Sequence, residues 1–155
     1  MKQKLKILIS SVGSLVSKNI LDVLESQYCY RRDLVYLIGT NSIANSSNNF
    51  NCDKCYLVPD TATPDFTELM TDILRTENPD LILNGRDEDA EVIALILMDN
   101  PDLKGKLPYG KLHTIRYALN KWETWLFTQK YSLPFANTFV RDKSGGITEL
   151  KSFDE

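Results

Sequence analysis

The stretch of sequence that decides the fold reads Lys6-Ile7-Leu8-Ile9-Ser10-Ser11-Val12-Gly13-Ser14. Its mainly aliphatic run, stopped by Gly13, is typical of a strand that is buried on both faces of a parallel sheet. After Ser14 the apolar residues recur every three or four positions, which predicts an amphipathic helix with Ser14 as its cap. These apolar residues are Leu15, Ile20, Leu21, Val23 and Leu24. The N-terminus is therefore predicted to form a strand followed by a helix.

The same alternation continues along the chain. Short apolar runs predict strands at residues 34–38, 55–58 and 80–83, and an edge strand at 106–109. Helical periodicity predicts helices at 65–77 and 90–98, while the Asn- and Ser-rich stretch 42–51 predicts a loop with at most one helical turn. Strands separated by helices imply right-handed crossovers and a parallel sheet. We therefore predict an α/β fold, with a Rossmann-like domain of residues 1–110 that has helices on both faces of its sheet.

Residues 111–155 are too few for a separate domain. Two helices are expected at 111–120 and 122–131. A hairpin is expected after them, with strands at 136–140 and 147–153 that join at a turn containing two glycines. This region is predicted to begin a second structural unit.

The composition excludes several classes of protein. The 155 residues are 43% hydrophobic and 25% charged, with a net charge of −3, as in an ordinary globular protein. The sequence has no cluster of basic residues, which a nucleic-acid-binding surface would need. The longest apolar stretch, at residues 92–98, is too short to cross a membrane. The N-terminus lacks a signal-peptide cleavage site, so a cytoplasmic location is expected.

Three cysteines, Cys29, Cys52 and Cys55, give an odd count that argues against a disulfide framework. Cys52 and Cys55 have the CxxC spacing of redox and zinc sites. A structural zinc needs four ligands, however, and the one histidine, His113, is distant in sequence. The cysteines are expected to be reduced, with Cys55 pointing inward from a strand, and no metal site is predicted.

Ligands of open parallel sheets bind at the carboxyl ends of the strands, where loops and helix N-termini meet. That edge is expected to hold two turns and one strand end, whose candidate substrate-side residues are Gly13, Ser14, Asn41, Asn84, Gly85, Arg86, Asp87 and Glu88. The acidic residues either hold a cationic substrate or cap a helix, and Arg86 either pairs with them or binds an anionic substrate. The turn at residues 10–15 has only one glycine, which argues against a dinucleotide, and no P-loop occurs.

Residues 120–127 and 131–138 resemble the segment that opens the ATP-grasp region of ATP-grasp ligases. In that family an Asp-Lys pair begins a helix, and a stretch rich in Gly, Pro and Thr ends it. Here the pair is Asn120-Lys121, while Ser132 replaces the glycine and Ala136 replaces the second proline. Upstream, the strand ends at 38–41, 52–59 and 80–89 also resemble the family in their order and spacing. The similarity is greatest to the carbamoyl-phosphate-synthase-like group, in which such an N-terminal domain precedes the ATP-grasp fold.

This resemblance implies an ATP-dependent ligase that uses Mg²⁺ and activates a carboxylate as an acylphosphate for attack by an amine. It assigns Lys121 to nucleotide phosphate and assigns no catalytic residue to this chain. The second phosphate-binding lysine, the adenine loop and the magnesium ligands would follow Glu155. The chain is therefore expected to be a truncated piece, inactive alone and without tight binding of ATP or Mg²⁺. Its expected partners are a small-molecule substrate and the remainder of the ATP-grasp region, and a homodimer is left open.

Two alternatives remain. One is a free-standing Rossmann-like module that binds a small nucleotide or metabolite or has a regulatory role. The other is an interaction domain without a ligand, in which the strand-end residues act only as helix caps.

Overall fold

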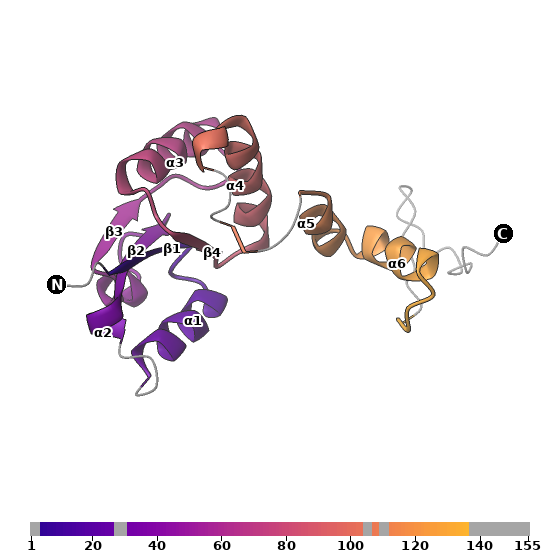
Figure 1. Cartoon of the computed structure of the whole chain (residues 1–155), viewed down its shortest axis with the longest axis horizontal. Helices are drawn as coiled ribbons and strands as arrows, with labels where there is room; N and C mark the ends of the chain where they lie inside the picture. Colours follow the sequence, from indigo (N-terminus) through magenta and orange to yellow (C-terminus); the bar gives the residue numbers. More distant parts are fainter. Residues whose placement is uncertain (1–3, 27–30, 104–106, 109–111, 137–155) are drawn as a thin grey trace. The chain divides into compact units, whose positions relative to one another are not determined.

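The computed structural model describes residues 4–26, 31–103, 107–108 and 112–136 (Figure 1). The chain divides into two compact units, Met1–Gly110 and Lys111–Glu155.

The first unit is built on a four-stranded parallel sheet with the strand order β3-β2-β1-β4. The strands are β1 (Leu5–Ser10), β2 (Val35–Asn41), β3 (Lys54–Leu57) and β4 (Leu81–Asn84). In the register, Ile9 lies opposite Gly39 of β2 and opposite Leu83 of β4, so β1 is the central strand. The parallel α/β fold that the sequence predicts is confirmed.

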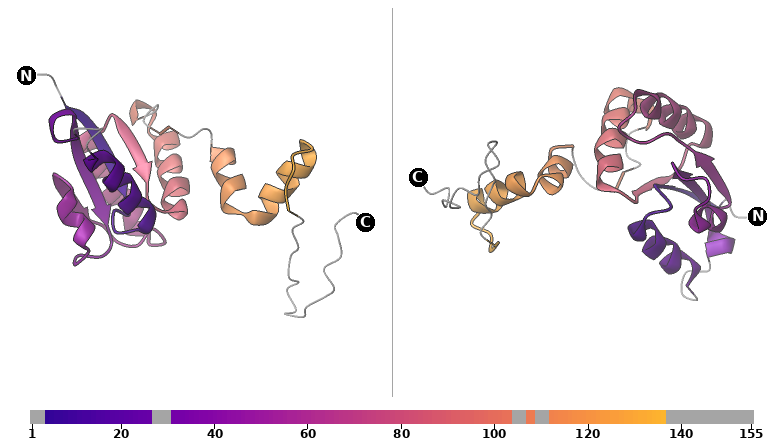
Figure 2. Two further views of the ribbon diagram at one scale, coloured as in Figure 1. Left: turned by 90° about the horizontal axis from the view of Figure 1, so that it is seen from below. Right: turned by 180° about the vertical axis from the view of Figure 1, so that it is seen from behind.

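Helices cover both faces of this sheet (Figures 1 and 2). One face carries α3 (Pro64–Glu77) and α4 (Asp87–Asp99), and the other carries α1 (Leu15–Glu25) and the short α2 (Arg31–Leu34). Two short 3-10 helices, η1 (Ser47–Asn51) and η2 (Pro101–Leu103), complete the described elements of this unit. A first apolar cluster unites residues of α3 and α4 with Leu8, Ile38 and Ile82 of the sheet. A second cluster joins Leu21 of α1 to Ile7, Ile9, Val12, Val35 and Leu37.

Most predicted elements lie within three residues of the observed ones, but three details were wrong. The first strand ends at Ser10 rather than at residue 12, because Ser11 takes a left-handed conformation (φ 45°) and starts the turn. Helix α2 was not predicted. Leu21 of α1 is buried as predicted, and Ile20 and Leu24 pack against the same cluster. Leu15 and Val23, which were expected on this inner face, are 78% and 67% exposed, and Ser17 faces inward beside Leu21.

Two predicted elements lie wholly or partly outside the described residues. The hairpin at 136–140 and 147–153 falls there except for residue 136. Of the edge strand at 106–109 only Leu107 and Pro108 are described, and Leu107 packs against the first cluster. Among the described helices, none has the length and apolar character that a membrane crossing requires.

The second unit contains two consecutive helices, α5 (Leu112–Leu119) and α6 (Lys121–Lys130). Asn120 caps α6, since its side-chain oxygen accepts hydrogen bonds from the backbone N–H groups of Trp122 at 3.0 Å and Glu123 at 3.4 Å. Trp125 is buried, and its ring stacks on that of Trp122 with centroids 4.8 Å apart. Both helices agree with the predicted ranges to within one residue.

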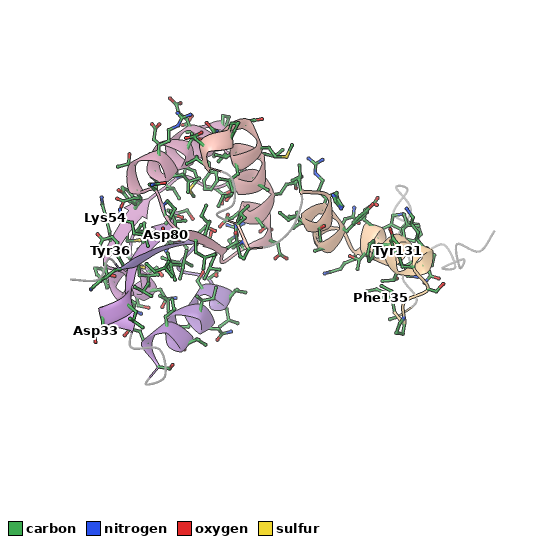
Figure 3. All side chains as sticks on the ribbon, in the orientation of Figure 1. Asp33, Tyr36, Lys54, Asp80, Tyr131 and Phe135 are labelled. Atoms are coloured by element: carbon green, nitrogen blue, oxygen red, sulfur yellow. The ribbon has the colours of Figure 1, made fainter. Side chains whose placement is uncertain are left out.

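A charged cluster closes the amino-terminal end of the sheet. Its centre is Glu77, the last residue of α3, which is only 6% exposed. The Glu77 carboxylate accepts hydrogen bonds from Lys54 Nζ at 2.6 Å and from the Tyr56 hydroxyl, and Lys6 Nζ lies 3.8 Å from it. Asp80 Oδ2 accepts the backbone N–H of Lys6 at 2.8 Å. In Figure 3 the labelled Lys54 and Asp80 mark this end of the sheet, opposite the end where ligands of parallel sheets bind.

Because Glu77 is buried and charged, it makes stability depend on pH. Burial alone would raise the pKa of Glu77, but the hydrogen bonds from Lys54 and Tyr56 outweigh this effect and lower the pKa below its ordinary value. Its contribution to stability is therefore present above the unfolded-state pKa and is lost as the pH falls through the lower folded-state pKa.

We expect Glu77→Gln to lower the free energy of unfolding at pH 7 by about 1 to 2 kcal/mol, since it removes a charge-assisted hydrogen-bond acceptor. The difference from the wild-type protein should shrink below about pH 4, close to the ordinary glutamate pKa. Urea unfolding at several pH values measures both effects. The control is Glu68→Gln, an exposed carboxylate on the same helix, which should change little. A loss for Glu77→Gln that is the same at pH 7 and pH 3 would contradict this explanation.

Candidate functional site

The carboxyl ends of β1, β2 and β4 meet at one edge of the sheet. We call this region the carboxyl edge and define it as residues 10–17, 39–41 and 84–89. Ser10 and Asn84 are register partners, and Gly85 N donates to Ser10 O at 3.0 Å. On the other side of β1, Val12 N donates to Thr40 O at 2.9 Å. The strand-end residues predicted from sequence are therefore brought together by the fold.

The turn after β1 packs closely against the end of β2. A Cβ on Gly13 would lie 2.7 Å from Asn41 Nδ2 and 2.9 Å from Ser46 Oγ. Asn41 is itself buried, and its amide donates to Asn49 Oδ1 at 2.7 Å. Gly13 thus allows the first turn to approach the polar loop that follows β2, and Asn41 is occupied in holding that loop.

Two serines join the first turn to the end of β4. Ser14 caps α1 by accepting the Ser17 N–H at 3.0 Å, as predicted, and its hydroxyl donates to Gly85 O at 2.7 Å. The buried Ser17 hydroxyl points at Ser11 O at 3.0 Å and at Ser10 O at 3.2 Å. Ser17 was not predicted as a site residue. One feature of the sequence could have indicated it: Ser17 is a small polar residue three positions after the helix cap, on a helix face whose other residues are apolar.

The Asn- and Ser-rich loop also shapes this edge. Its short helix η1 places the buried Asn48 so that Nδ2 donates to Val12 O at 3.0 Å. Asn49 Nδ2 donates to Ile43 O at 2.9 Å and to Ala44 O at 3.0 Å. Composition alone predicted a loop here, whereas the amide side chains fix its shape through hydrogen bonds to the backbone.

The acidic turn after β4 forms the first turn of α4. Asp87 and Glu88 are exposed there, and their negative charges suit the positive end of the helix dipole. Arg86 lies 3.5 Å from Glu88 Oε2 and 3.7 Å from Asp60 Oδ2, and its side chain is 39% exposed. Both of these ion pairs are open to solvent and are therefore weak. Arg86, Asp87 and Glu88 thus remain available to a charged ligand.

A row of polar side chains, buried except for the half-buried Asn84, lies behind this turn. Ser10, Thr40 and Asn84 each follow a core residue of the first cluster by two positions, so all three side chains face α3 and α4. These core residues are Leu8, Ile38 and Ile82. Asp89 reaches the same side from α4, and its Oδ1 accepts the Thr61 hydroxyl at 2.5 Å.

Three atoms of this row make no hydrogen bond to any residue that the structure describes: Ser10 Oγ, Thr40 Oγ1 and Asp89 Oδ2. Each belongs to a side chain that is at most 1% exposed. Buried polar atoms normally have a partner, and a group without a protein partner is usually satisfied by water or by a ligand. The row therefore gives the carboxyl edge two hydroxyls and a carboxylate oxygen with spare hydrogen-bonding capacity.

The predicted site residues thus separate into two groups. Gly13, Ser14, Asn41, Asn84, Gly85, Arg86, Asp87 and Glu88 all belong to the carboxyl edge of the first unit. Lys121 belongs to the second unit, where it is the exposed first residue of α6 beside the Asn120 cap. Binding by either group stays a prediction. Within the described ranges, no three His, Cys, Asp or Glu side chains cluster in a way that could hold a metal ion.

No protein-family model matches the sequence, and no curated protein matches it significantly. Solved structures do match it. N5-carboxyaminoimidazole ribonucleotide synthetase from Thermotoga maritima is 17% identical over 90% of this chain and 34% of its own, with a TM-score of 0.62. The biotin carboxylase domain of 2-oxoglutarate carboxylase from Hydrogenobacter thermophilus is 11% identical over 93% of this chain and 32% of its own, with a TM-score of 0.60.

An L-amino acid ligase from Bacillus licheniformis matches with 14% identity and a TM-score of 0.56, over 86% of this chain and 32% of its own. The chain thus spans about a third of the length of these structures. At these identities the comparison concerns the fold, and it agrees with the resemblance seen in the sequence. The chain has the fold of the N-terminal region of ATP-grasp enzymes.

Proposed function

We propose that this chain is the N-terminal, substrate-side domain of an ATP-dependent carboxylate–amine ligase that works through an acylphosphate. The observation that supports this most is the extent of the structural match. The first unit ends at Gly110, yet the match covers 90% of the 155 residues, so it must continue into the second unit. A Rossmann-like domain alone would match only over the first unit. The second unit is where the ATP-grasp resemblance and Lys121 lie.

In this reaction a carboxylate oxygen attacks the terminal phosphate of ATP, which releases ADP and leaves an acylphosphate. An amine then attacks the acyl carbon and displaces inorganic phosphate. Clamping the phosphates with cations supplies most of the stabilisation of such transition states. In this chain the exposed Lys121, at the N-terminus of α6, has the charge and position for one phosphate contact. In the proposed ligase the magnesium ligands belong to the remainder of the ATP-grasp region.

The carboxyl edge would form one wall of the substrate site. Arg86 has the charge to hold the carboxylate substrate, while Asp87 and Glu88 have the charge to hold an amine before it is deprotonated for attack. Ser14 and Gly85 give the wall its shape through their hydrogen bond. One neighbour is named as an L-amino acid ligase, so L-amino acids are the first substrates to test. A carbamoyl-phosphate-synthase-like specificity remains a narrower form of this proposal.

The proposal also covers location and partners. We expect a cytoplasmic protein whose partners are a small-molecule substrate and the remainder of an ATP-grasp region. A nucleic-acid or membrane partner is not part of it, and self-association into a homodimer is left open.

The 155-residue chain by itself is expected to show no ATP turnover, because in the proposed ligase it supplies only one phosphate-binding lysine, while the second lysine and the magnesium ligands belong to the remainder of the ATP-grasp region. The measurement is ADP release by the highly purified chain with ATP and Mg²⁺, with and without mixed L-amino acids. The Lys121→Ala variant distinguishes intrinsic turnover from a contaminant. Steady ADP release that this variant abolishes would refute the expectation.

The second candidate is a free-standing small-molecule-binding or regulatory module. It is favoured by the buried polar row, whose three atoms with spare capacity all belong to the first unit. The two candidates differ in what the chain binds without ATP. Tight metabolite binding by the 155-residue chain alone, detected by calorimetry, would support the module over the ligase domain.

A further inference from the structure

The proposed ligase site makes no use of Cys52 and Cys55, yet the structure places these residues together. Cys52 immediately follows η1, and Cys55 is the second residue of β3. Side chains three positions apart on a regular strand point to opposite faces. Here the chain bends at residues 52 and 53 before β3 begins, and both cysteines pack against the second cluster. The two thiols therefore share one face of the sheet.

Gly39 leaves a space that both sulfur atoms border. Gly39 lies opposite Cys55 in the register of β2 and β3. A Cβ placed on Gly39 would be 2.7 Å from Cys52 Sγ and 3.2 Å from Cys55 Sγ. Both sulfurs therefore border one point, and they lie within a few ångströms of each other. Any side chain at position 39 would enter this shared space.

The residue between the cysteines fixes the bend. Asp53 N donates to Leu37 O at 2.9 Å, and Asp53 Oδ2 accepts the Leu37 N–H at 2.7 Å, so Asp53 is tied to β2 by two hydrogen bonds. Cys52 Sγ also faces Asn48 O at 3.8 Å. These contacts hold the cysteine-bearing segment in the conformation that brings the sulfurs together, which lowers the entropy lost when a bond forms between them.

We propose that Cys52 and Cys55 form a reversible intramolecular disulfide over Gly39, by exchange with a low-molecular-weight disulfide. Both cysteines are partly exposed, so such a reagent can reach them. This inference does not depend on the proposed ligase function. The observation that supports it is that both sulfurs lie close to the point where a Cβ on Gly39 would be.

The exchange proceeds in two steps. The Cys52 thiolate attacks one sulfur of the reagent, forms a mixed disulfide and releases one small thiol. Cys55 then loses its proton, attacks Cys52 Sγ and releases the second small thiol. The two cysteines lose two electrons, the reagent gains them, and the two cysteine protons end on the released thiols. Burial raises the pKa of the Cys55 thiol, which disfavours Cys55 as the first attacker.

The sequence allows a direct test. Trypsin cleaves after Lys54, so Cys52 lies in peptide 33–54 and Cys55 in peptide 55–75, while Cys29 lies in a third peptide, 19–31. The chain is equilibrated with reduced and oxidised glutathione at several ratios, blocked by alkylation and digested without reduction. Mass spectrometry then gives the fraction of peptide 33–54 linked to 55–75. The same equilibration in concentrated urea gives the reference for the unfolded chain.

The linked fraction at each glutathione ratio gives the equilibrium constant for forming the Cys52–Cys55 disulfide from oxidised glutathione, which is the effective concentration of the two thiols. We expect this effective concentration to be at least about tenfold higher in the folded chain than in urea, because folding holds the sulfurs close to each other. Cys29→Ser should leave this ratio unchanged, and Cys52→Ser should abolish the linked peptides. An effective concentration in the folded chain equal to or below that in urea would overturn the proposal. So would preferential linkage through Cys29.

Discussion

Replacing Gly85 with alanine is expected to lower the free energy of unfolding by about 3 kcal/mol, which is high in the range for overpacking. An alanine Cβ would lie 2.0 Å from Ser17 Oγ, 2.5 Å from Ser10 O and 2.7 Å from Ser11 O. Two of these atoms are backbone carbonyls of β1 and its turn, so they cannot move by rotating a side chain. Relief of the overlap would weaken the hydrogen bonds that Gly85 makes to Ser10 and Ser14.

Gly13→Ala is the matched control. Its Cβ would also meet close neighbours, at 2.7 Å and 2.9 Å, but these are side-chain atoms of Asn41 and Ser46, and Gly13 is exposed. We expect a smaller loss, of about 1 to 2 kcal/mol, for this variant, because side chains can shift where backbone carbonyls cannot. Urea unfolding followed by circular dichroism measures both. Equal losses for the two variants would show that Gly85 is not packed closely against the first turn.

In an active protein containing this chain, Lys121→Ala is expected to lower kcat/KM for ATP at least about tenfold, equivalent to about 1.4 kcal/mol of transition-state stabilisation. Lys121 is the exposed first residue of α6, so its ammonium and the positive end of the helix dipole can act on one phosphate. The matched control is Lys130→Ala. Lys130 ends the same helix, about two and a half turns away, beside the Tyr131 ring at 5.6 Å.

Lys130→Ala should leave kcat/KM for ATP nearly unchanged. Both variants are first compared with the wild-type protein by circular dichroism, so that a folding defect is not read as lost phosphate binding. Equal effects of the two substitutions would remove Lys121 from the nucleotide site. They would also remove the residue on which the ATP-binding part of the proposal depends.

The sequence predicts this fold well because its signals are local. The apolar run of β1 and the periodicity of α3 each follow from neighbouring residues, and the Ser14 cap is recognisable from residue type alone. Part of the inner face of α1, at Leu15 and Val23, was misjudged for a physical reason. A buried Ser17 hydroxyl that hydrogen-bonds to the first turn orients the helix there, so apolar periodicity is not the deciding signal.

The candidate site was predictable only as a region. Parallel topology places the strand ends at one edge, which is why Gly13, Asn41 and Asn84 could be named in advance. The contacts that shape the edge join residues far apart in the sequence. The hydrogen bond from Ser14 to Gly85 spans 71 positions, and nothing local in the chain specifies such a pair. The convergence of Cys52 and Cys55 likewise depends on the missing side chain of Gly39 on the neighbouring strand.

The most direct test of the ligase proposal is ADP release by the longer ligase that is proposed to contain this chain, supplied with Mg²⁺ and ATP and with mixtures of carboxylates and amines. The account predicts release that requires a carboxylate, rises further with an amine, and yields a product joining the two. It also predicts that the 155-residue chain releases no ADP under the same conditions. ADP release that is unaffected by either mixture, or no release by that longer protein, would contradict the assignment to a carboxylate–amine ligase.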